Sequence, residues 1–476
     1  MTYTWLKRFG CVSGFLALGL ILGACSNDTN QTTTTEPALS GSNEVATQDN
    51  EVEAQELRIV WRDLGENDNL RRFFENYFVE SFEAANPDIR LVLAPIMASE
   101  ADYFGRVALS MQSPDTAPDI VAQDSFQLNA DASAGFLLPL DNRVHAWDEW
   151  DYYIENIKQG YVAQSGRLYA IPGTSDSRGL WVNLSVLEEA GLPANWSPTT
   201  WEEILEGARA IRDNTDAIPL GFNVARSAGE AVTMQTFLMF LEGTDDSLFD
   251  QASGQFVARS QGFLDSLRFI DTVFNQENLS PSLSMAMGTN YASLMFQELL
   301  PTGQAGIALD GFWNVNNWLE GGAHPLDNPE EIMAFLPMPT QFGQGAGSVT
   351  MSGGWGWAIP YNSQNHDLAW RVLQAMGSAE NQAIRATLEG NLTVREDSAT
   401  NPRYTAVPFM EIATGFLANS QFRPAREEYP QISVEIQTAV EAVASGSSTP
   451  EQAMDEFERN VLRIVGEGNA VIRETN

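Results

Sequence analysis

Cysteine is almost absent from this chain: only Cys11 and Cys25 occur, and none follows Cys25. A disulfide framework is therefore excluded for everything beyond residue 25. Lysine is as scarce, since Lys158 is the only one after Lys7. The few histidines do not pair at metal-ligand spacing, and the sequence contains no glycine-rich phosphate loop and no internal repeat. No metal, cofactor or catalytic set is predicted.

Positive charge is also rare. The formal net charge is −37, and the part after the basic pair Lys7–Arg8 is more acidic still. A surface of this sign repels nucleic acids and anionic lipids, so neither is an expected partner. With 43% hydrophobic and 10% aromatic residues, the chain is nevertheless long and apolar enough to build two or three domains.

The first 25 residues contain an apolar run that is too short to span a membrane. Lys7 and Arg8 precede an uncharged stretch that ends in "LGAC", which predicts a signal peptide over residues 1–25. An uncleaved membrane anchor is the alternative. The ending resembles the bacterial lipobox, which implies that Cys25 is acylated and becomes the new N-terminus. Residues 26–55 are polar, with few groups to bury, and fit a disordered tether.

Apolar and amphipathic segments alternate after the tether. "LRIVW" (57–61), "RLVLAPI" (90–96) and "PDIVAQD" (118–124) read as strands. Between them, the spacing of Phe73, Tyr77, Phe78 and Phe82 predicts a helix, and "YFGRVALSMQ" predicts another. This order indicates an α/β layer around a parallel sheet.

Polar residues follow two of these strands directly. Ligands of open α/β sheets bind beyond the carboxyl ends of the strands. The candidate contacts there are Arg62, Asp63, Gln123, Asp124 and Ser125. Each of them also fits a solvated loop residue.

The middle of the chain contains a candidate crossover between two domains. Two extended pieces, 168–171 and 180–182, flank the small polar segment 173–179, which suits a crossover between domains. A helix begins at Trp201, because Thr200 and Glu203 have the spacing of a capping box. "SQGFLDSLRFIDTVFNQ" predicts a further long helix.

Two stretches combine glycine with tryptophan: "GQAGIALDGFWNVNNW" and "GSVTMSGGWGWAIPYNS". An indole offers a flat apolar face and an N–H group, which suits stacking on a sugar ring. We expect Trp313 and Trp355 at a binding site and Trp357 in the core; the alternative is the core for the first two and the site for Trp357.

These motifs together resemble the bacterial extracellular solute-binding proteins of ABC importers, of the maltose/maltodextrin kind (family 1). The matching pieces follow the family's order over nearly all of residues 56–470, among them "FEAANPDIRLVL", "APDIVAQDS", "GFLLPLD", "GRLYAIP", "LWVNLSVLEEAGL", "SPTTWEEI", "GQAGIALDGFW", "GGWGWAIP" and "AWRVLQAMGSAENQ".

The resemblance implies a periplasmic-binding-protein-like clamshell of two α/β lobes joined by hinge crossovers. Lobe 1 would comprise residues 56–173 with 355–405, and lobe 2 residues 178–350 with 410–476. The ligand would lie in the cleft, and hinge motion would close the lobes on it. The protein would be an extracytoplasmic, lipid-anchored monomer, in the periplasm or on the outer face of the cell membrane. It would deliver a sugar or oligosaccharide to the transmembrane subunits of a permease.

Family positions carry over residue by residue. Arg62–Asp63 and Gln123–Ser125 match two loops that bond sugar hydroxyls, and Asp176 matches an acidic contact at the first crossover. Trp313 matches a stacking aromatic, Trp355 lies on a strand that lines the cleft, and Arg423 offers a charged contact. One departure stands out, because Ile436 occupies the place of a stacking tryptophan in maltodextrin binders.

Two other functions remain open from the sequence. An exported glycoside hydrolase needs a pair of carboxylates, and among 63 acidic residues such pairs arise by chance. A receptor of the same fold could instead pass a ligand signal to a membrane sensor.

Overall fold

The structure is a computed structural model that describes residues 54–63, 65 and 68–475. They belong to one compact unit, Val52–Asn476. The predicted signal peptide, Cys25 and nearly all of the predicted tether lie outside the described residues. Within the described part, no helix combines the length and apolarity that crossing a membrane requires.

The first lobe is built on a five-stranded sheet of order β3-β1-β5-β15-β6. Its strands are β1 (Gln55–Val60), β3 (Ile89–Leu93), β5 (Ile120–Asp124), β6 (Ala170–Pro172) and β15 (Trp355–Ala358). β1 runs parallel to β3 and β5, as the alternating pattern predicts. β15 is antiparallel to both neighbours, because it enters the sheet after a crossover from the other lobe. The sheet is therefore mixed rather than purely parallel.

The predicted first helix is present but interrupted. It consists of α1 (Asn69–Phe73), the π-helical turn η1 (Phe74–Phe78) and α2 (Val79–Ala85). The π turn adds a residue to the register, so Phe74 is buried against Trp61 and Trp357. Tyr77, which the 3–4 spacing places on the apolar stripe, is 40% exposed instead. That part of the sequence prediction is wrong.

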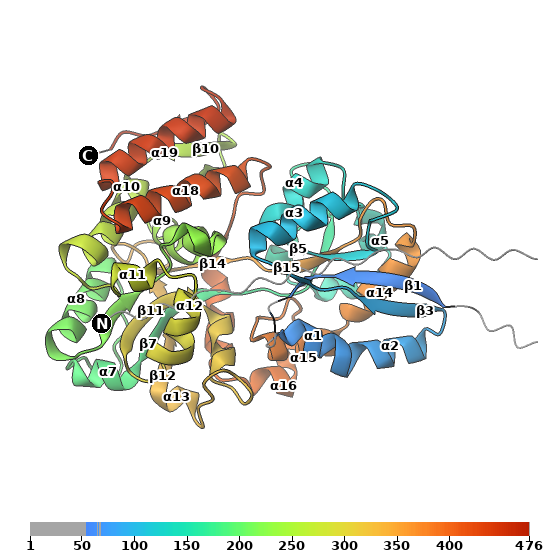
Figure 1. The fold of residues 1–476 in the computed structure, drawn as a ribbon, viewed down its shortest axis with the longest axis horizontal. Helices are drawn as coiled ribbons and strands as arrows, with labels where there is room; N and C mark the ends of the chain where they lie inside the picture. The colour runs from blue at the N-terminus through green and yellow to red at the C-terminus, as the bar shows by residue number, and fades with distance from the viewer. Residues whose placement is uncertain (1–53, 64, 66–67, 476) are drawn as a thin grey trace, which may run out of the picture. The chain divides into compact units, whose positions relative to one another are not determined.

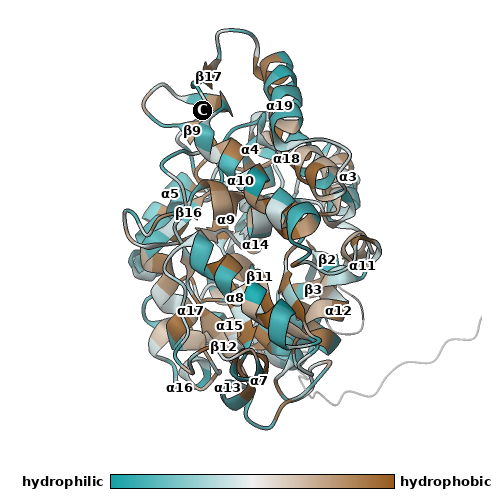
Figure 2. Ribbon diagram, turned by 90° about the vertical axis from the view of Figure 1, so that its left-hand side faces the viewer, coloured by the Kyte–Doolittle hydropathy of each residue, from teal (hydrophilic) through white to brown (hydrophobic). Residues whose placement is uncertain are grey.

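The second lobe contains a four-stranded sheet of order β12-β7-β11-β8. Its strands are β7 (Arg178–Asn183), β8 (Ile218–Gly221), β11 (Ala305–Gly311) and β12 (Met333–Leu336). The helices of this lobe include α8 (Trp201–Asn214), α10 (Gln261–Asp271), α18 (Tyr429–Ala444) and α19 (Pro450–Val465). Figure 2 shows hydrophilic and hydrophobic residues alternating along the ribbon of α8, whose buried side includes Trp201, Ile204 and Ile211.

The start of α8 differs slightly from the predicted capping box. The Thr200 hydroxyl accepts a hydrogen bond from the Glu203 amide at 3.2 Å, as expected. The Glu203 carboxylate, however, accepts from the amide and the hydroxyl of Thr199 rather than from the Thr200 amide. The N-terminus of α8 therefore has both side-chain bonds of a capping box, but the bond from the Glu203 carboxylate reaches Thr199 instead of Thr200.

Three segments lie at the predicted crossovers between the lobes. The first, 173–177, runs from β6 to β7, and the second runs from β14 (Ser348–Ser352) through Gly353 and Gly354 to β15. The third leads from α16 (Pro402–Thr405) to α17 (Met410–Phe416). The first two touch: a Cβ at Gly354 would lie 2.0 Å from the Thr174 carbonyl oxygen, and Gly354 has φ of +134°. Only glycine fits there.

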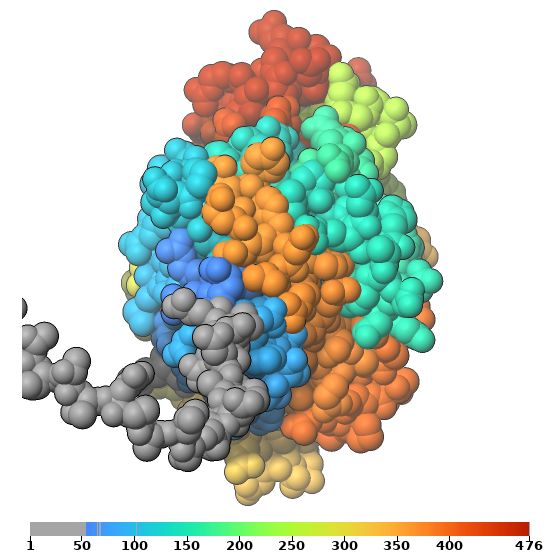
Figure 3. All heavy atoms as spheres, turned by 90° about the vertical axis from the view of Figure 1, so that its right-hand side faces the viewer, coloured from blue at the N-terminus to red at the C-terminus, as the bar shows by residue number. Residues whose placement is uncertain are grey.

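The arrangement in space follows from these connections. Figure 1 shows the two groups of elements on either side of β14 and β15. Figure 3 shows that the outer face of lobe 1 combines early segments with a later one, coloured blue to teal and orange respectively. The predicted two-lobed α/β fold is confirmed, while the residue boundaries of the lobes stay predictions.

Candidate ligand-binding site

A cavity of about 1390 Å³ lies between the lobes. Both lobes contribute to its lining, and so do the first crossover, through Thr174 and Asp176, and the third, through Ala406 and Pro408. The predicted ligand contacts that line it are Arg62, Asp124, Asp176, Trp313, Trp355 and Arg423. These residues come from distant parts of the sequence, and the fold brings them to one place.

Three predicted contacts do not line the cavity. Asp63 is 6% exposed, pairs with Arg71 at 2.5 Å and accepts a hydrogen bond from the Gly65 amide. Gln123 is fully buried and donates to Asp131 at 2.7 Å. The Ser125 hydroxyl accepts from the Arg423 guanidinium at 3.1 Å. All three serve the protein's own hydrogen bonds in this structure.

Trp313 follows β11 and is half-buried. Its six-membered ring lies directly over Gly311, where a Cβ would fall 2.0 Å from a ring atom. The Arg178 guanidinium carbon is 5.0 Å from the ring centre. Glycine and arginine thus fix the orientation of an indole that still contributes to the cavity wall.

Trp355 at the start of β15 is also half-buried. Its ring stacks on Phe104, with 5.5 Å between centroids and 9° between planes, and Tyr103 lies edge-on to it. Phe104 belongs to α3 (Glu100–Met111). Trp357, two residues later, is 2% exposed, so the expectation that it belongs to the core is confirmed.

Asp176 connects the first two crossovers. Its carboxylate pairs with Arg178 and accepts a hydrogen bond of 2.9 Å from the Gly353 amide. Arg178 also donates to the Met351 carbonyl. An acidic side chain at this position therefore ties the hinge strands together, and its remaining lone pairs are available to a ligand hydroxyl.

Arg62 and Glu100 form the lobe 1 wall, with 3.3 Å between guanidinium and carboxylate. Burial raises the pKa of Glu100 to about 7, and the negative charge of Asp124 adds to the effect. Burial raises the pKa of Asp124 as well, although the Arg423 guanidinium opposes it. In their ionised form, desolvated carboxylates of this kind accept strong hydrogen bonds from hydroxyl groups.

Several residues of the cavity wall carried no clear signal in the sequence: Glu100, Arg178, Glu230 and Arg385. Arg178 lies two residues after Asp176 in "SDSRG", but only the aspartate was predicted as a contact. Glu230 lies between the glycine turn at Gly229 and the π-helix η4 (Ala231–Phe237). π-helical turns often mark functional sites, but the sequence did not predict this one.

Ile436 is fully buried in α18, so the side chain at this position is part of the core. The residue of α18 that lines the cavity is Gln437. The side chain that α18 contributes to the cavity wall is therefore an amide, which is polar rather than aromatic.

The chain matches the model of the bacterial extracellular solute-binding proteins over residues 67–383. It belongs to this family. A binding protein of Brucella abortus is 23% identical over 391 residues, which cover 79% of this chain and 87% of that one. The family consists of binding proteins and not of enzymes, as the sequence predicts for this chain.

Solved structures of the same fold support the assignment. A maltose-bound MalE3 of Thermotoga maritima superimposes with a TM-score of 0.73 at 21% identity, covering 86% of this chain and 99% of its own. A solute-binding protein of Thermotoga lettingae with bound α-D-tagatose gives 0.72 at 22% identity, covering 86% and 100%. This solute-binding protein therefore has the two-lobed fold of its structural neighbours.

Proposed function

We propose that this solute-binding protein binds a sugar or oligosaccharide between its lobes and delivers it to the permease of an ABC importer. One observation supports this most: the cavity combines two half-buried indoles, Trp313 and Trp355, with charged hydrogen-bonding groups from both lobes. Indole rings cover the apolar C–H face of a sugar, while carboxylates and guanidinium groups bond its hydroxyls.

The proposed contacts divide by chemistry. Trp313 and Trp355 would stack on the ligand. Arg62, Asp124 and Asp176 would bond hydroxyl groups, and each bond in a site without water would discriminate against analogues that lack the hydroxyl. Structural neighbours with bound maltose and α-D-tagatose fit a carbohydrate, and they leave open its size.

Anchoring is a separate part of the proposal. Acylation of Cys25 by two or more chains would hold the protein at the extracytoplasmic side of the cell membrane, as a monomer on a polar tether. Metabolic labelling with radioactive palmitate tests it. We expect Cys25→Ser to lose the label and leave the membrane fraction, and the matched control Cys11→Ser to retain both. Label that persists in Cys25→Ser would contradict the anchor.

Uptake by living cells tests the delivery step. The test uses a sugar that the purified protein binds. A strain that lacks this protein should take up that sugar at a strongly reduced rate, and the intact gene should restore uptake. Uptake that is unchanged, together with a lost transcriptional response to the sugar, would contradict transport and favour the receptor.

A further inference from the structure

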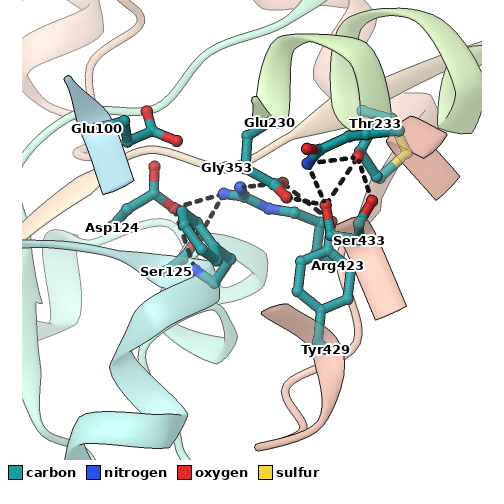
Figure 4. Close-up of polar contacts among 12 residues, drawn as sticks. Glu100, Asp124, Ser125, Glu230, Thr233, Gly353, Arg423, Tyr429 and Ser433 are labelled. Carbon is teal, nitrogen blue, oxygen red and sulfur yellow. Dashed lines mark hydrogen bonds and ion pairs between the residues drawn. The ribbon is translucent and has the colours of Figure 1, made fainter. Parts of the chain in front are cut away.

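Arg423 lies between β16 (Ser420–Phe422) and α18, and it touches both lobes (Figure 4). Its Nη2 is 2.6 Å from the Asp124 carboxylate, at the end of β5 in lobe 1. Its Nη1 is 3.1 Å from the carboxylate of Glu230, which precedes η4 in lobe 2. The arginine side chain is 5% exposed. One cation therefore neutralises two carboxylates that belong to different lobes.

We propose that Arg423, Asp124 and Glu230 form an interlobe latch, which sets how far the lobes stand apart in the absence of ligand. All three residues line the cavity, so the latch joins the lobes on the side of the cleft. A hinge motion that opens the cleft moves Asp124 away from Glu230, and Arg423 then loses one of its partners. The latch favours the closed arrangement for this reason.

The lobe 2 end of the latch is held in place before closure. Glu230 accepts hydrogen bonds from the hydroxyls of Tyr429 and Ser433 on α18 (Figure 4). Ser433 in turn bonds the Thr233 hydroxyl at 2.7 Å. A carboxylate fixed by two hydroxyls loses little freedom when it pairs with Arg423, and pre-organised pairs are the stronger ones.

The lobe 1 end is equally well defined. Asp124 caps α4 (Ser125–Ser133) by accepting from the Phe126 amide at 3.1 Å. The Phe126 ring lies under Arg423, with the guanidinium carbon 4.9 Å from the ring centre, and meets the edge of Tyr429 at 6.2 Å. Phe126 of lobe 1 thus contacts both Arg423 and Tyr429 of lobe 2, in addition to the ion pair between the lobes.

Removing the arginine should reverse the preference of the lobes. Asp124 and Glu230 would then face each other without a shared cation, with Glu100 and Asp176 as further acids near Asp124. Among the described residues, Arg62 pairs with Glu100 and Arg178 with Asp176, so the loss of Arg423 leaves Asp124 and Glu230 without an ion-pair partner. Uncompensated carboxylates in a partly dry cleft repel one another, so the variant should open.

The latch gives Arg423 a role other than the direct ligand contact that the sequence suggested. The apparent dissociation constant equals the intrinsic one divided by the fraction of protein in the competent state, so a residue that raises the closed fraction raises affinity without touching the ligand. This inference does not depend on the ligand being a carbohydrate.

A distance measurement without ligand tests the latch. Residues 26–476, with Cys25→Ser, contain the whole compact unit and no cysteine. Leu109→Cys on α3 and Arg459→Cys on α19 are exposed positions on the two lobes, and they accept a pair of spin labels. Pulsed electron paramagnetic resonance on the parent should show one short distance. Arg423→Met should add a longer-distance population.

Arg426→Met is the matched control. It removes the same charge from the same segment, but its guanidinium lies over the Phe249 ring of lobe 2 at 4.6 Å and pairs with no carboxylate among the described residues. We expect the parental distance in this control. Asp124→Asn breaks the latch from lobe 1 and keeps a residue that can cap α4. Asp124→Asn replaces Arg423→Met in the distance measurement if Arg423→Met does not fold. Parental distances in every folded latch variant would overturn the proposal and leave the proposed function standing.

Discussion

The Arg178 guanidinium lies 5.0 Å from the centre of the Trp313 ring, although the two residues are far apart in the sequence. β7 and β11 pair with Arg178 opposite Gly311, so the strand register itself brings the arginine to the indole. Trp313 itself follows the sheet in the 3-10 turn η7 (Phe312–Asn317), and the paired strands of lobe 2 hold the arginine against it. The Trp313 indole is thus oriented before a ligand binds, so binding does not have to order it.

We expect Trp313→Ala to weaken carbohydrate binding by about 1 kcal/mol or more, because the stacking surface is lost. The free energy of unfolding should change little, because the ring is half-buried. Isothermal titration and urea unfolding measure the two effects separately.

Trp318→Ala is the control for Trp313. Trp318 is fully buried, does not line the cavity, and donates from its indole to the Phe296 carbonyl. Truncating it should lower the free energy of unfolding by about 3–5 kcal/mol and leave the affinity of the folded protein intact. If Trp313→Ala behaved in the same way, Trp313 would belong to the core and the stacking role would be wrong.

Stability should depend on pH through Glu100. Its pKa of about 7 lies above the ordinary value of 4.5, so the folded protein keeps a proton that the unfolded chain releases between these pH values. This group therefore makes the free energy of unfolding fall as pH rises from about 4.5 to 7. Glu100→Gln removes the effect. Its stability relative to the parent should rise across that window and stay constant above it.

Glu242→Gln provides the comparison for this titration. Burial raises the pKa of Glu242 to about 7 as well, but this residue does not line the cavity. Both variants should show the same trend in urea unfolding, and only Glu100→Gln should also change the pH dependence of ligand affinity. A stability difference that does not vary with pH would contradict the protonation of Glu100.

Gly354→Ala should destabilise the fold by more than about 1 kcal/mol. Gly354 has φ of +134°, and an added Cβ would collide with the Thr174 carbonyl at the junction of two crossovers. Gly105→Ala in α3 is the matched control, because among the described residues no atom outside its own helix backbone lies within 4 Å of its Cβ position. That change should stabilise the helix by about 0.5–1 kcal/mol. Equal thermal stability of the two variants would contradict the strained crossover.

The sequence predicted the parts of the fold that local patterns encode. Hydrophobic strands, capped helices and small-residue crossovers leave signals within about ten residues, and β5 and α8 appeared close to where they were predicted. The π turn at Phe74–Phe78 has no such signal, and Tyr77 was misplaced for that reason.

The site was only partly predictable, because its contacts join distant segments. Position after a strand pointed to Arg62 and Asp124, but it could not tell that Asp63 pairs with Arg71. Nor could it predict that Arg423 meets two carboxylates, since one lies 299 residues away and the other 193. Such pairs follow from the packing of the lobes.

Thermal unfolding in the presence of candidate ligands tests the central claim most directly. Residues 26–476, with Cys25→Ser, would be heated with mono-, di- and oligosaccharides, polyols, sugar phosphates and amino acids. A ligand at 100 times its dissociation constant stabilises the folded protein by about 2.7 kcal/mol, which raises the midpoint clearly. We predict a rise for one class of carbohydrate, with the sugar recovered unchanged. A rise confined to amino acids, or a sugar recovered in cleaved form, would contradict the account.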